Sequence, residues 1–495
     1  MKISKTAWQF CMLRWAALYL FVLSVWLIFP LVACAESMPS SDSQPIRIRA
    51  DMDGPQPLTI LGAIELAKRN YPAIKTAALK ADAAREGITQ AKTAYLPHAD
   101  LLLDENYGTA NNITGFLAPQ NIVPNISGAV RDHNNFQGGF GFTTGALVSW
   151  EPFDLGLRKA QVNVARTATS QSEAQIAVTQ LEAQSHAADA FLSVLAAQQV
   201  VKAAQAKVDR LKIFLDTVRV LAQKELKAKT DEYLAEAELV RSKDELIAAE
   251  QNYKIAVAAL IKWTGLSTET IDATPGALLK EAPTNYFTVA DLRSHPLAMA
   301  QQATIELVHA RKNALERSYA PRFFLRAPIY ARGSSFNPDL SLNYGHGYYP
   351  TTLNYAISAL MVFPAMDIFQ LKAQRRAENK NELSERSRYD EIFLNLKEQD
   401  ARARAMIEGA VGIAANAPIK VNASQKAADS ARIRYRYQLA SVNDVALDEQ
   451  LLTQSQVEYA TAQLQVWRAL LAAAVAHGDL KPFIDSVSKA SKGAN

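Results

Sequence analysis

The chain has only two cysteines in 495 residues, Cys11 and Cys34, and both lie near the N-terminus. A disulfide framework or a cysteine-ligated metal site needs more cysteines than that, so both are excluded for the rest of the chain. The seven histidines are scattered without the spacing of a zinc-protease helix, and no metal site is expected. No nucleophile elbow, Walker A loop or dinucleotide-binding loop is present. We therefore expect no catalytic residues, no enzyme activity and no cofactor.

A large excess of charge of one sign is also absent. Without residues 1–35, which hold three basic and no acidic residues, the chain has 50 basic and 49 acidic residues. A balanced chain of this kind does not favour nucleic acid as a partner. The local run that contains Arg432, Arg434 and Arg436 is more typical of a solvated helix face.

The first 35 residues form a targeting segment. Lys2, Lys5 and Arg14 precede an apolar run over residues 15–32, and Ala33-Cys34-Ala35 offers a cleavage site. Residues 31–34 also resemble a lipobox, in which Cys34 would be lipidated. Cleavage after Ala35, lipidation of Cys34 and an uncleaved anchor helix remain alternatives. Export of a chain with almost no cysteine fits a bacterial envelope protein.

After residue 35, long hydrophobic runs are missing as well. No apolar stretch reaches the ~20 residues that a membrane-spanning helix needs. If the mature chain crosses a membrane, it has to do so with strands that close into a barrel.

What the sequence does contain is a duplication. Four landmarks recur in order: Pro72 and Pro296, Pro97 and Pro321, Asp154 and Asp367, and Asp231 and Asn443. The first two pairs are 224 residues apart, the third 213 and the fourth 212. The offset falls because a loop near 108–137 corresponds to a shorter loop near 333–352. A repeat of this length predicts two similar halves rather than a solenoid.

The repeat divides the chain into five parts. Residues 1–35 are the signal segment, and residues 36–57 are an extended arm. The first repeat is predicted over 58–280 and the second over 281–480, with a C-terminal tail over 481–495. Each repeat begins with helices, continues with two strands and ends with a long helical pair.

Four strands are predicted where apolar and polar residues alternate, at about 98–107, 138–151, 321–332 and 354–364. Alternation places Phe140, Phe142 and Trp150 on one side of their strand, which we interpret as lipid-facing. In the third strand the alternating cations are expected to line a barrel lumen; they are Arg322, Arg326 and Arg332.

The long helical pairs are predicted over 154–264 and 367–478. Proline is absent from the first long helix, and the second contains only Pro418, which is expected to kink or interrupt it. About 70 residues at 1.5 Å each give roughly 100 Å of helix, which exceeds the length of helices in compact domains. Apolar residues at three- and four-residue spacing indicate coiled-coil packing.

Four strands cannot close a barrel, and an open sheet edge cannot face lipid. The chain must therefore oligomerise if these strands lie in a membrane. Two copies would give eight strands with a filled interior, and three would give twelve with room for a channel. The fold class is a mixed α and β membrane protein with an internal duplication.

Over residues 57–480 the chain resembles the TolC-type outer membrane efflux family. The resemblance rests on the order of four stretches, which are Leu58–Pro72, Ala94–Pro97, Trp150–Gly156 and Tyr435–Val445. It implies a homotrimer whose 12-stranded barrel lies in the bacterial outer membrane and continues as a helical coiled-coil tunnel in the periplasm. It also implies a periplasmic adaptor protein and an inner-membrane pump as partners.

The resemblance further implies a periplasmic gate at the turn before the last helix. Asp444 and Tyr435 match gate positions of the family, Asp448 lies one residue from another, and Glu232 occupies the corresponding tip of the first repeat. The family's usual glycine in this turn is Gln438, with Leu226 as its repeat partner. A simpler interpretation of Asp444 is an acid that stabilises a helix N-terminus.

These features predict the outer-membrane component of a tripartite efflux or type I secretion system, a passive duct. The alternative is a periplasmic coiled-coil scaffold or adhesin without a pore. A diffusion porin is a third hypothesis, although porins consist almost entirely of strands. The cargo is not encoded in this chain, because pump and adaptor select it.

Overall fold

The computed structural model describes residues 56–109, 134, 136–266, 271–279, 291–337 and 341–492. The signal segment, Cys34, nearly all of the arm and most of the first loop lie outside these ranges. The chain divides into two units, and the first comprises Met1–Gly54 and Leu266–Thr268. Every helix and strand described below belongs to the second unit, Pro55–Gly265 with Glu269–Asn495.

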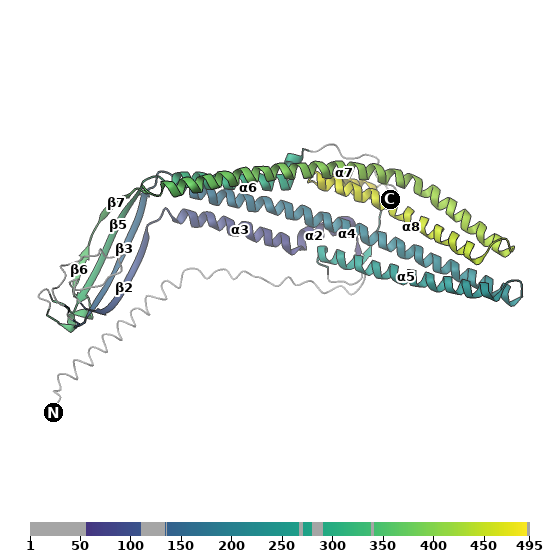
Figure 1. The fold of residues 1–495 in the computed structure, drawn as a ribbon, viewed down its shortest axis with the longest axis horizontal. Coiled ribbons are helices and arrows are strands. Elements are labelled where there is room, and N and C mark those ends of the chain that lie inside the picture. The colour runs from purple at the N-terminus through teal and green to yellow at the C-terminus, as the bar shows by residue number, and fades with distance from the viewer. Residues whose placement is uncertain are drawn as a thin grey trace, which may run out of the picture. The chain divides into compact units, whose positions relative to one another are not determined.

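One antiparallel sheet contains all the predicted strands. Its strands are β2 (His98–Gly108), β3 (Gly139–Phe153), β5 (Arg322–Ser334), β6 (Thr352–Tyr355) and β7 (Ser358–Val362). Strand β3 lies between β2 and β5, and both β6 and β7 pair with the other edge of β5 (Figure 1). Two lateral edges therefore remain open within the described chain, one on β2 and one on β6 and β7.

The predicted fourth strand is interrupted, and Pro328 explains why. Strands β6 and β7 keep one register against β5, with Tyr355 opposite Ile329 and Ser358 opposite Arg326. In that register Ala356 lies opposite Pro328, whose carbonyl accepts the Ala356 N–H at 3.0 Å. Proline has no N–H to return, so the ladder breaks at this point. The two short strands are one predicted strand with a gap.

The two faces of the sheet differ in chemistry. Register places alternate residues of all strands on one apolar face, and its exposed members are Leu101, Leu103, Val148, Trp150, Leu325, Ile329, Leu353, Tyr355 and Met361. Leu101 is 84% exposed and Ile329 is 50% exposed. The opposite face contains His98, Asp100, Asp104, Arg322, Arg326 and Arg332. Exposed apolar area of this extent marks an interaction surface.

Long helices continue from the sheet. They are α2 (Ile60–Asn70), α3 (Pro72–Thr93), α4 (Leu157–Gln223), α5 (Lys229–Thr264), α6 (Pro296–Arg317), α7 (Ile368–Arg436) and α8 (Val442–Ala476). Near the sheet, α3 packs on α4, α4 on α6 and α6 on α7 (Figure 1). Farther along, α5 packs on α4, α4 on α8 and α8 on α7. The 67 residues of α4 extend ~100 Å.

Helix α7 runs without interruption through Pro418, so the predicted interruption does not occur. One missing N–H is tolerated in a helix of 69 residues that packs along its length on α6 and α8. Among the described residues, no helix is both long and apolar enough to cross a bilayer.

The junction between β3 and α4 lies at the end of Trp150–Gly156, one of the four stretches on which the family resemblance rests. Asp154 accepts the Gly156 N–H at 3.1 Å and binds the Arg158 side chain at 3.0 Å. Gly156 has φ +96°, a conformation that glycine adopts without strain. The cap turns the chain from strand to helix within three residues.

Smaller elements complete the fold. Strands β1 (Gln56–Leu58) and β4 (Ile271–Ala273) form a parallel pair, and η1 (Leu292–Ser294) and η2 (Tyr344–Gly347) are 3₁₀ turns. The predicted tail contains helix α9 (Lys481–Lys492), whose buried Phe483 meets Trp467 edge-on at 6.2 Å.

Candidate functional site

The turns that join α4 to α5 and α7 to α8, called here the two tips, share one geometry. Glu225 and Gln438 both have positive φ, 59° and 63°. Each tip also has a backbone hydrogen bond that spans six residues. Leu226 N–H donates to the Leu221 carbonyl at 2.9 Å, and Leu439 N–H donates to the Arg434 carbonyl at 2.8 Å. This pattern is the Schellman motif, which favours glycine at the positive-φ residue.

The shared motif corrects the repeat alignment at the tips. The positive-φ residues are 213 residues apart, so the partner of Gln438 is Glu225, not Leu226. The same offset pairs Asp444 with Asp231 rather than with Glu232. Sequence landmarks missed this because a one-residue shift at a turn changes no hydrophobic pattern.

We expect Glu225→Gly to raise the free energy of unfolding by about 1 kcal/mol, because glycine adopts this positive φ without steric cost. Urea unfolding followed by circular dichroism measures the change. The matched control is Lys224→Gly, since Lys224 has φ −88° and gains nothing from glycine. A stability gain from the control as large as that from Glu225→Gly would contradict the explanation.

The two tips are tied to each other through Tyr435. Its hydroxyl donates to Asp231 Oδ2 at 3.0 Å, although its ring is fully buried. The ring meets Phe214 edge-on at 5.1 Å and lies under Lys227 Nζ at 4.4 Å. Burial, together with the Asp231 carboxylate, raises the pKa of Tyr435 well above its usual value. Tyr435 therefore remains a hydrogen-bond donor at any physiological pH.

A second, weaker contact joins the tips. Gln438 Nε2 donates to the Leu226 carbonyl at 3.3 Å. Gln438 has positive φ and stands where the family usually has glycine. The side chain that glycine would lack therefore contacts the opposite tip. Sequence reasoning named Tyr435 and missed Asp231, because nothing local distinguishes Asp231 from other acids in a helical first turn.

Asp444 caps helix α8. Its Oδ2 accepts the Ser441 N–H at 2.8 Å, while Ser441 Oγ accepts the Asp444 N–H at 3.2 Å. These hydrogen bonds to Ser441 lower the pKa of Asp444. The arrangement is a capping box, the simpler of the two interpretations from the sequence. The side chain is nevertheless exposed at the tip.

The other acids of the gate hypothesis have different surroundings. Glu232 binds Lys229 Nζ at 2.6 Å and Arg219 Nε at 3.2 Å, and the first of these contacts does most to lower its pKa. It is therefore held by its own helical hairpin rather than by the second tip. Asp448 lies half-buried one turn after Asp444 on α8.

Behind the tips, a buried carboxylate joins the helices α4, α7 and α8. Glu449 on α8 is 1% exposed and accepts Arg210 Nε at 2.7 Å and Arg432 Nε at 2.6 Å. The sequence placed Arg432 on a solvated face. The structure places it in an ion cluster between helices, which only knowledge of the helix neighbours could indicate.

The candidate lumen residues share the polar face of the sheet. Arg322 donates to both carboxylate oxygens of Glu151 at 2.8 Å. Its guanidinium lies 5.0 Å from the Phe324 ring, and that of Arg326 lies 5.8 Å from it. The cations that alternation placed on one side thus share a face, which also carries the exposed Leu360 and Val362, and its role as a lumen stays a proposal.

The candidate lipid-facing residues share the opposite face but not the same exposure. Phe140 lies between Tyr107 at 4.8 Å and Tyr348 at 4.5 Å, and Phe142 is 8% exposed. Trp150 is 40% exposed and donates from Nε1 to the Tyr95 carbonyl at 3.0 Å. Phe142 is buried by its own chain, so it has little surface left to contact lipid, whereas Trp150 keeps its exposure.

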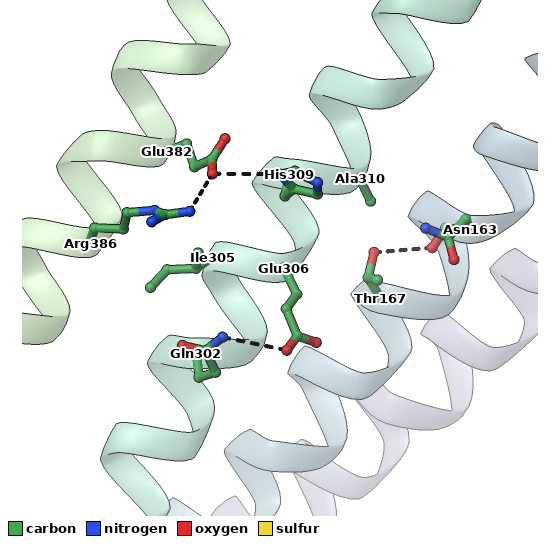
Figure 2. Close-up of a pocket in the computed structure, with 9 residues that line it drawn as sticks. All are labelled: Asn163, Thr167, Gln302, Ile305, Glu306, His309, Ala310, Glu382 and Arg386. Carbon is green, nitrogen blue, oxygen red and sulfur yellow. Dashed lines mark hydrogen bonds and ion pairs between the residues drawn. The ribbon is translucent and has the colours of Figure 1, made fainter. Parts of the chain in front are cut away.

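A pocket of about 420 Å³ lies among α4, α6 and α7. Figure 2 shows Glu382 and Arg386 facing α6, where His309 approaches Glu382 at 3.5 Å. Lys312 also binds Glu382, and Arg386 does so at 2.8 Å. These partners, Lys312 first, lower the pKa of Glu382 to about 2. No group of metal ligands occurs here or elsewhere in the described ranges.

The pH dependence of stability in the Glu382→Gln variant tests whether the ion pairs of Glu382 stabilise the fold. Because the pKa of Glu382 is lower in the folded state than in the unfolded state, its ionised carboxylate stabilises the fold at pH values above 4.5. This contribution to the free energy of unfolding is lost as the pH falls from 4.5 toward about 2. We therefore expect a lower melting temperature for the variant at pH 7 and a difference that shrinks below pH 4.5. Melting curves between pH 7 and pH 3 measure it. A difference independent of pH would contradict the ionic explanation.

Comparison with known proteins agrees with this architecture. The family model described as outer membrane efflux protein matches residues 63–266. None of the curated protein sequences matches the chain.

Solved structures match over most of the chain. The outer membrane channel CmeC of Campylobacter jejuni is 14% identical with a TM-score of 0.66, over 88% of this chain and 90% of that chain. The open-state outer membrane channel MtrE of Neisseria gonorrhoeae is 17% identical with a TM-score of 0.66, over 85% and 89%. The outer membrane protein VceC of Vibrio cholerae is 15% identical with a TM-score of 0.65, over 85% and 96%. The resemblance found in the sequence is thus confirmed: residues 63–266 match the model of the outer membrane efflux protein family, and the chain has the fold of outer membrane channels.

Proposed function

We propose that this chain is the outer-membrane component of a tripartite efflux or type I secretion system and acts as a passive export duct. The observation that carries the proposal is the sheet. One face is apolar and exposed over several strands, the other face carries the charged side chains of β2 and β5, and helices of ~100 Å continue from the sheet. A lipid-facing surface and a water-facing surface on one sheet are what a barrel wall requires.

The open sheet edges support an oligomer. Within the described chain, β2 pairs only with β3, and β6 and β7 pair only with β5. Unpaired edges in a bilayer must find partners, and other copies of the chain can supply them. Three copies, with four strand positions each, give a 12-stranded barrel with room for a channel. The helices would then form a tunnel in the periplasm, where an adaptor and an inner-membrane pump would dock.

A periplasmic scaffold or adhesin without a pore remains the second candidate. It would account for the coiled-coil helices equally well. It does not account for the apolar sheet face, because exposed leucines such as Leu101 and Leu353 would contact water at a cost of about 25 cal/mol per Å².

Deleting the encoding gene separates the two functions. A duct predicts greater sensitivity to toxic compounds or loss of a secreted protein, and reintroducing the gene should restore the wild-type phenotype. A deletion strain without either defect across broad compound panels and secretome analysis would count against export.

At the tips, the proposal includes a gate. The tie between Tyr435 and Asp231 holds the two helical pairs of one chain together, and an open tunnel end needs those pairs to separate. Asp444 and Asp448 would then contribute carboxylates near the axis, where symmetry gathers like charges and attracts cations.

Tyr435→Phe removes the hydroxyl that binds Asp231 and keeps the ring. A hydrogen bond to a charged group contributes about 1.5–3 kcal/mol, so the open-to-closed ratio should rise at least about tenfold. Single-channel recording in planar bilayers measures open probability. Tyr437→Phe is the matched control, since Tyr437 is exposed two residues further on. Equal open probability in Tyr435→Phe and wild type would remove this tie from the gate.

A further inference from the structure

Each repeat contains a joint at which a short helix begins beside the end of a long one. In the first joint α3 begins beside the end of α5, and in the second joint α6 begins beside the end of α8. Figure 1 shows α6 leading from the second joint to the sheet and α8 leading to the tips. Gly478, which follows α8 with φ +73°, allows the close approach, because a β-carbon there would lie 2.8 Å from the His295 ring.

A single buried histidine holds the second joint. His295 is 1% exposed and directly precedes α6. Its Nδ1 accepts the Leu297 N–H at 3.1 Å, and its Nε2 donates to the Val475 carbonyl, in the last turn of α8, at 3.1 Å. One ring nitrogen has to accept while the other donates, so these partners require the neutral imidazole with its proton on Nε2. An uncharged ring therefore ties the two helices together.

The surroundings of His295 do not favour a second proton on the ring. Within the described ranges no ion pair joins His295 to an acid, and His477 faces it from the end of α8. The carboxylate that α7 contributes here, Asp400, binds His477 at 2.8 Å and Arg404 at 2.9 Å instead. The other charged side chains of the adjoining segments are exposed; they are Asp291, Arg293, Asp479 and Lys481. Burial lowers the pKa of His295 below its usual 6.5, and His477 adds to this effect.

We infer that the second joint is acid-sensitive: a proton on His295 Nδ1 releases the start of α6 from the end of α8. That proton removes the acceptor of the Leu297 N–H and leaves two donors facing each other. It also places a charge in a buried site without an acid beside it, which costs far more than burying the neutral ring. Acid therefore shifts the joint toward its open form. The contact lies within one chain, so the inference does not depend on the proposed duct.

The first joint lacks this sensitivity because an amide holds it. Asn70 Nδ2 donates to the Thr264 carbonyl at 3.0 Å, and an amide side chain has no proton to gain in this pH range. His186 is exposed and stacks on the Trp263 ring of α5, so a proton on it buries no charge. Acid is therefore expected to open the second joint and to leave the first closed.

Hydrogen exchange of the purified full-length mature protein at pH 7.5 and pH 5.5 tests the second joint. His295 has its usual pKa of 6.5 when the joint is open and stays neutral when it is closed, so the open population should rise about tenfold between these pH values. Protection factors, which correct for the intrinsic pH dependence of exchange, should fall about tenfold for amides 297–300. Amides 73–76, at the start of α3, should keep theirs.

Variants assign the effect to His295. Asparagine and serine are good helix caps without a titrating group, so protection in His295→Asn and in His295→Ser should not change with pH. His309→Asn is the matched control, because it removes a half-exposed histidine farther along α6, and it should respond as the wild type does. Unchanged protection of the wild type at pH 5.5 would overturn the inference. So would an equal fall in the His295 variants or at the first joint, because the loosening would then have another cause.

Discussion

Replacing Ile329 by arginine is expected to keep the protein out of the outer membrane. Ile329 lies mid-strand on β5, half exposed on the apolar face between Ala146 and Tyr355. An arginine at the centre of a lipid-facing strand costs about 2–4 kcal/mol per chain, and an oligomer bears the cost in every copy. The measurement is the fraction of protein in outer-membrane fractions and in refolding into lipid vesicles.

Tyr330→Arg is the matched control for this substitution. Tyr330 is the next residue along β5 and therefore lies on the opposite face, with Arg326 and Arg332. We expect this variant to insert as the wild type does. If both variants insert equally well, the apolar face does not contact lipid and the assignment of the two faces is wrong.

Glu449→Ala is expected to lower the free energy of unfolding by about 3 kcal/mol. The substitution removes a carboxylate that is almost completely buried, so Arg210 loses its carboxylate partner and Arg432 keeps only the exposed Asp429. Loss of one partner from a buried ion cluster costs more than the pair contributes, because the remaining charge stays desolvated. Guanidinium unfolding followed by circular dichroism measures the difference.

Glu458→Ala provides the comparison on the same helix. Glu458 also binds a cation of α7, Lys420, but both side chains are exposed, 39% and 48%. Exposed pairs contribute about 0.2–1 kcal/mol, so this variant should remain near wild type. Similar losses for Glu449→Ala and Glu458→Ala would mean that burial does not determine the effect.

Periodicity predicted the elements well where one residue pattern lasted several turns or strand positions. The strand predicted at about 98–107 is observed at His98–Gly108, and the long helix predicted from Asp367 is observed from Ile368. Both depend on local alternation or spacing, which a single sequence displays. The gap between β6 and β7 was missed because its cause, Pro328, lies on a different strand.

Contacts between distant residues account for most of what sequence reasoning missed at the tips. Asp231 binds a tyrosine 204 positions away, and Glu449 binds Arg210 from a helix of the other repeat. Asp444 does lie at a helix N-terminus, as one of its two interpretations from the sequence had it, and its capping box occupies four consecutive residues. Its place in a gate depends on neighbouring copies, so it stays a prediction.

Single-channel recording of the purified mature protein in a planar bilayer distinguishes a passive duct from a scaffold. A duct should give discrete conductance steps without any energy source, and a higher open probability when Tyr435→Phe releases the tie to Asp231. Membrane insertion without conductance, in wild type and Tyr435→Phe alike, would contradict a duct and favour the scaffold.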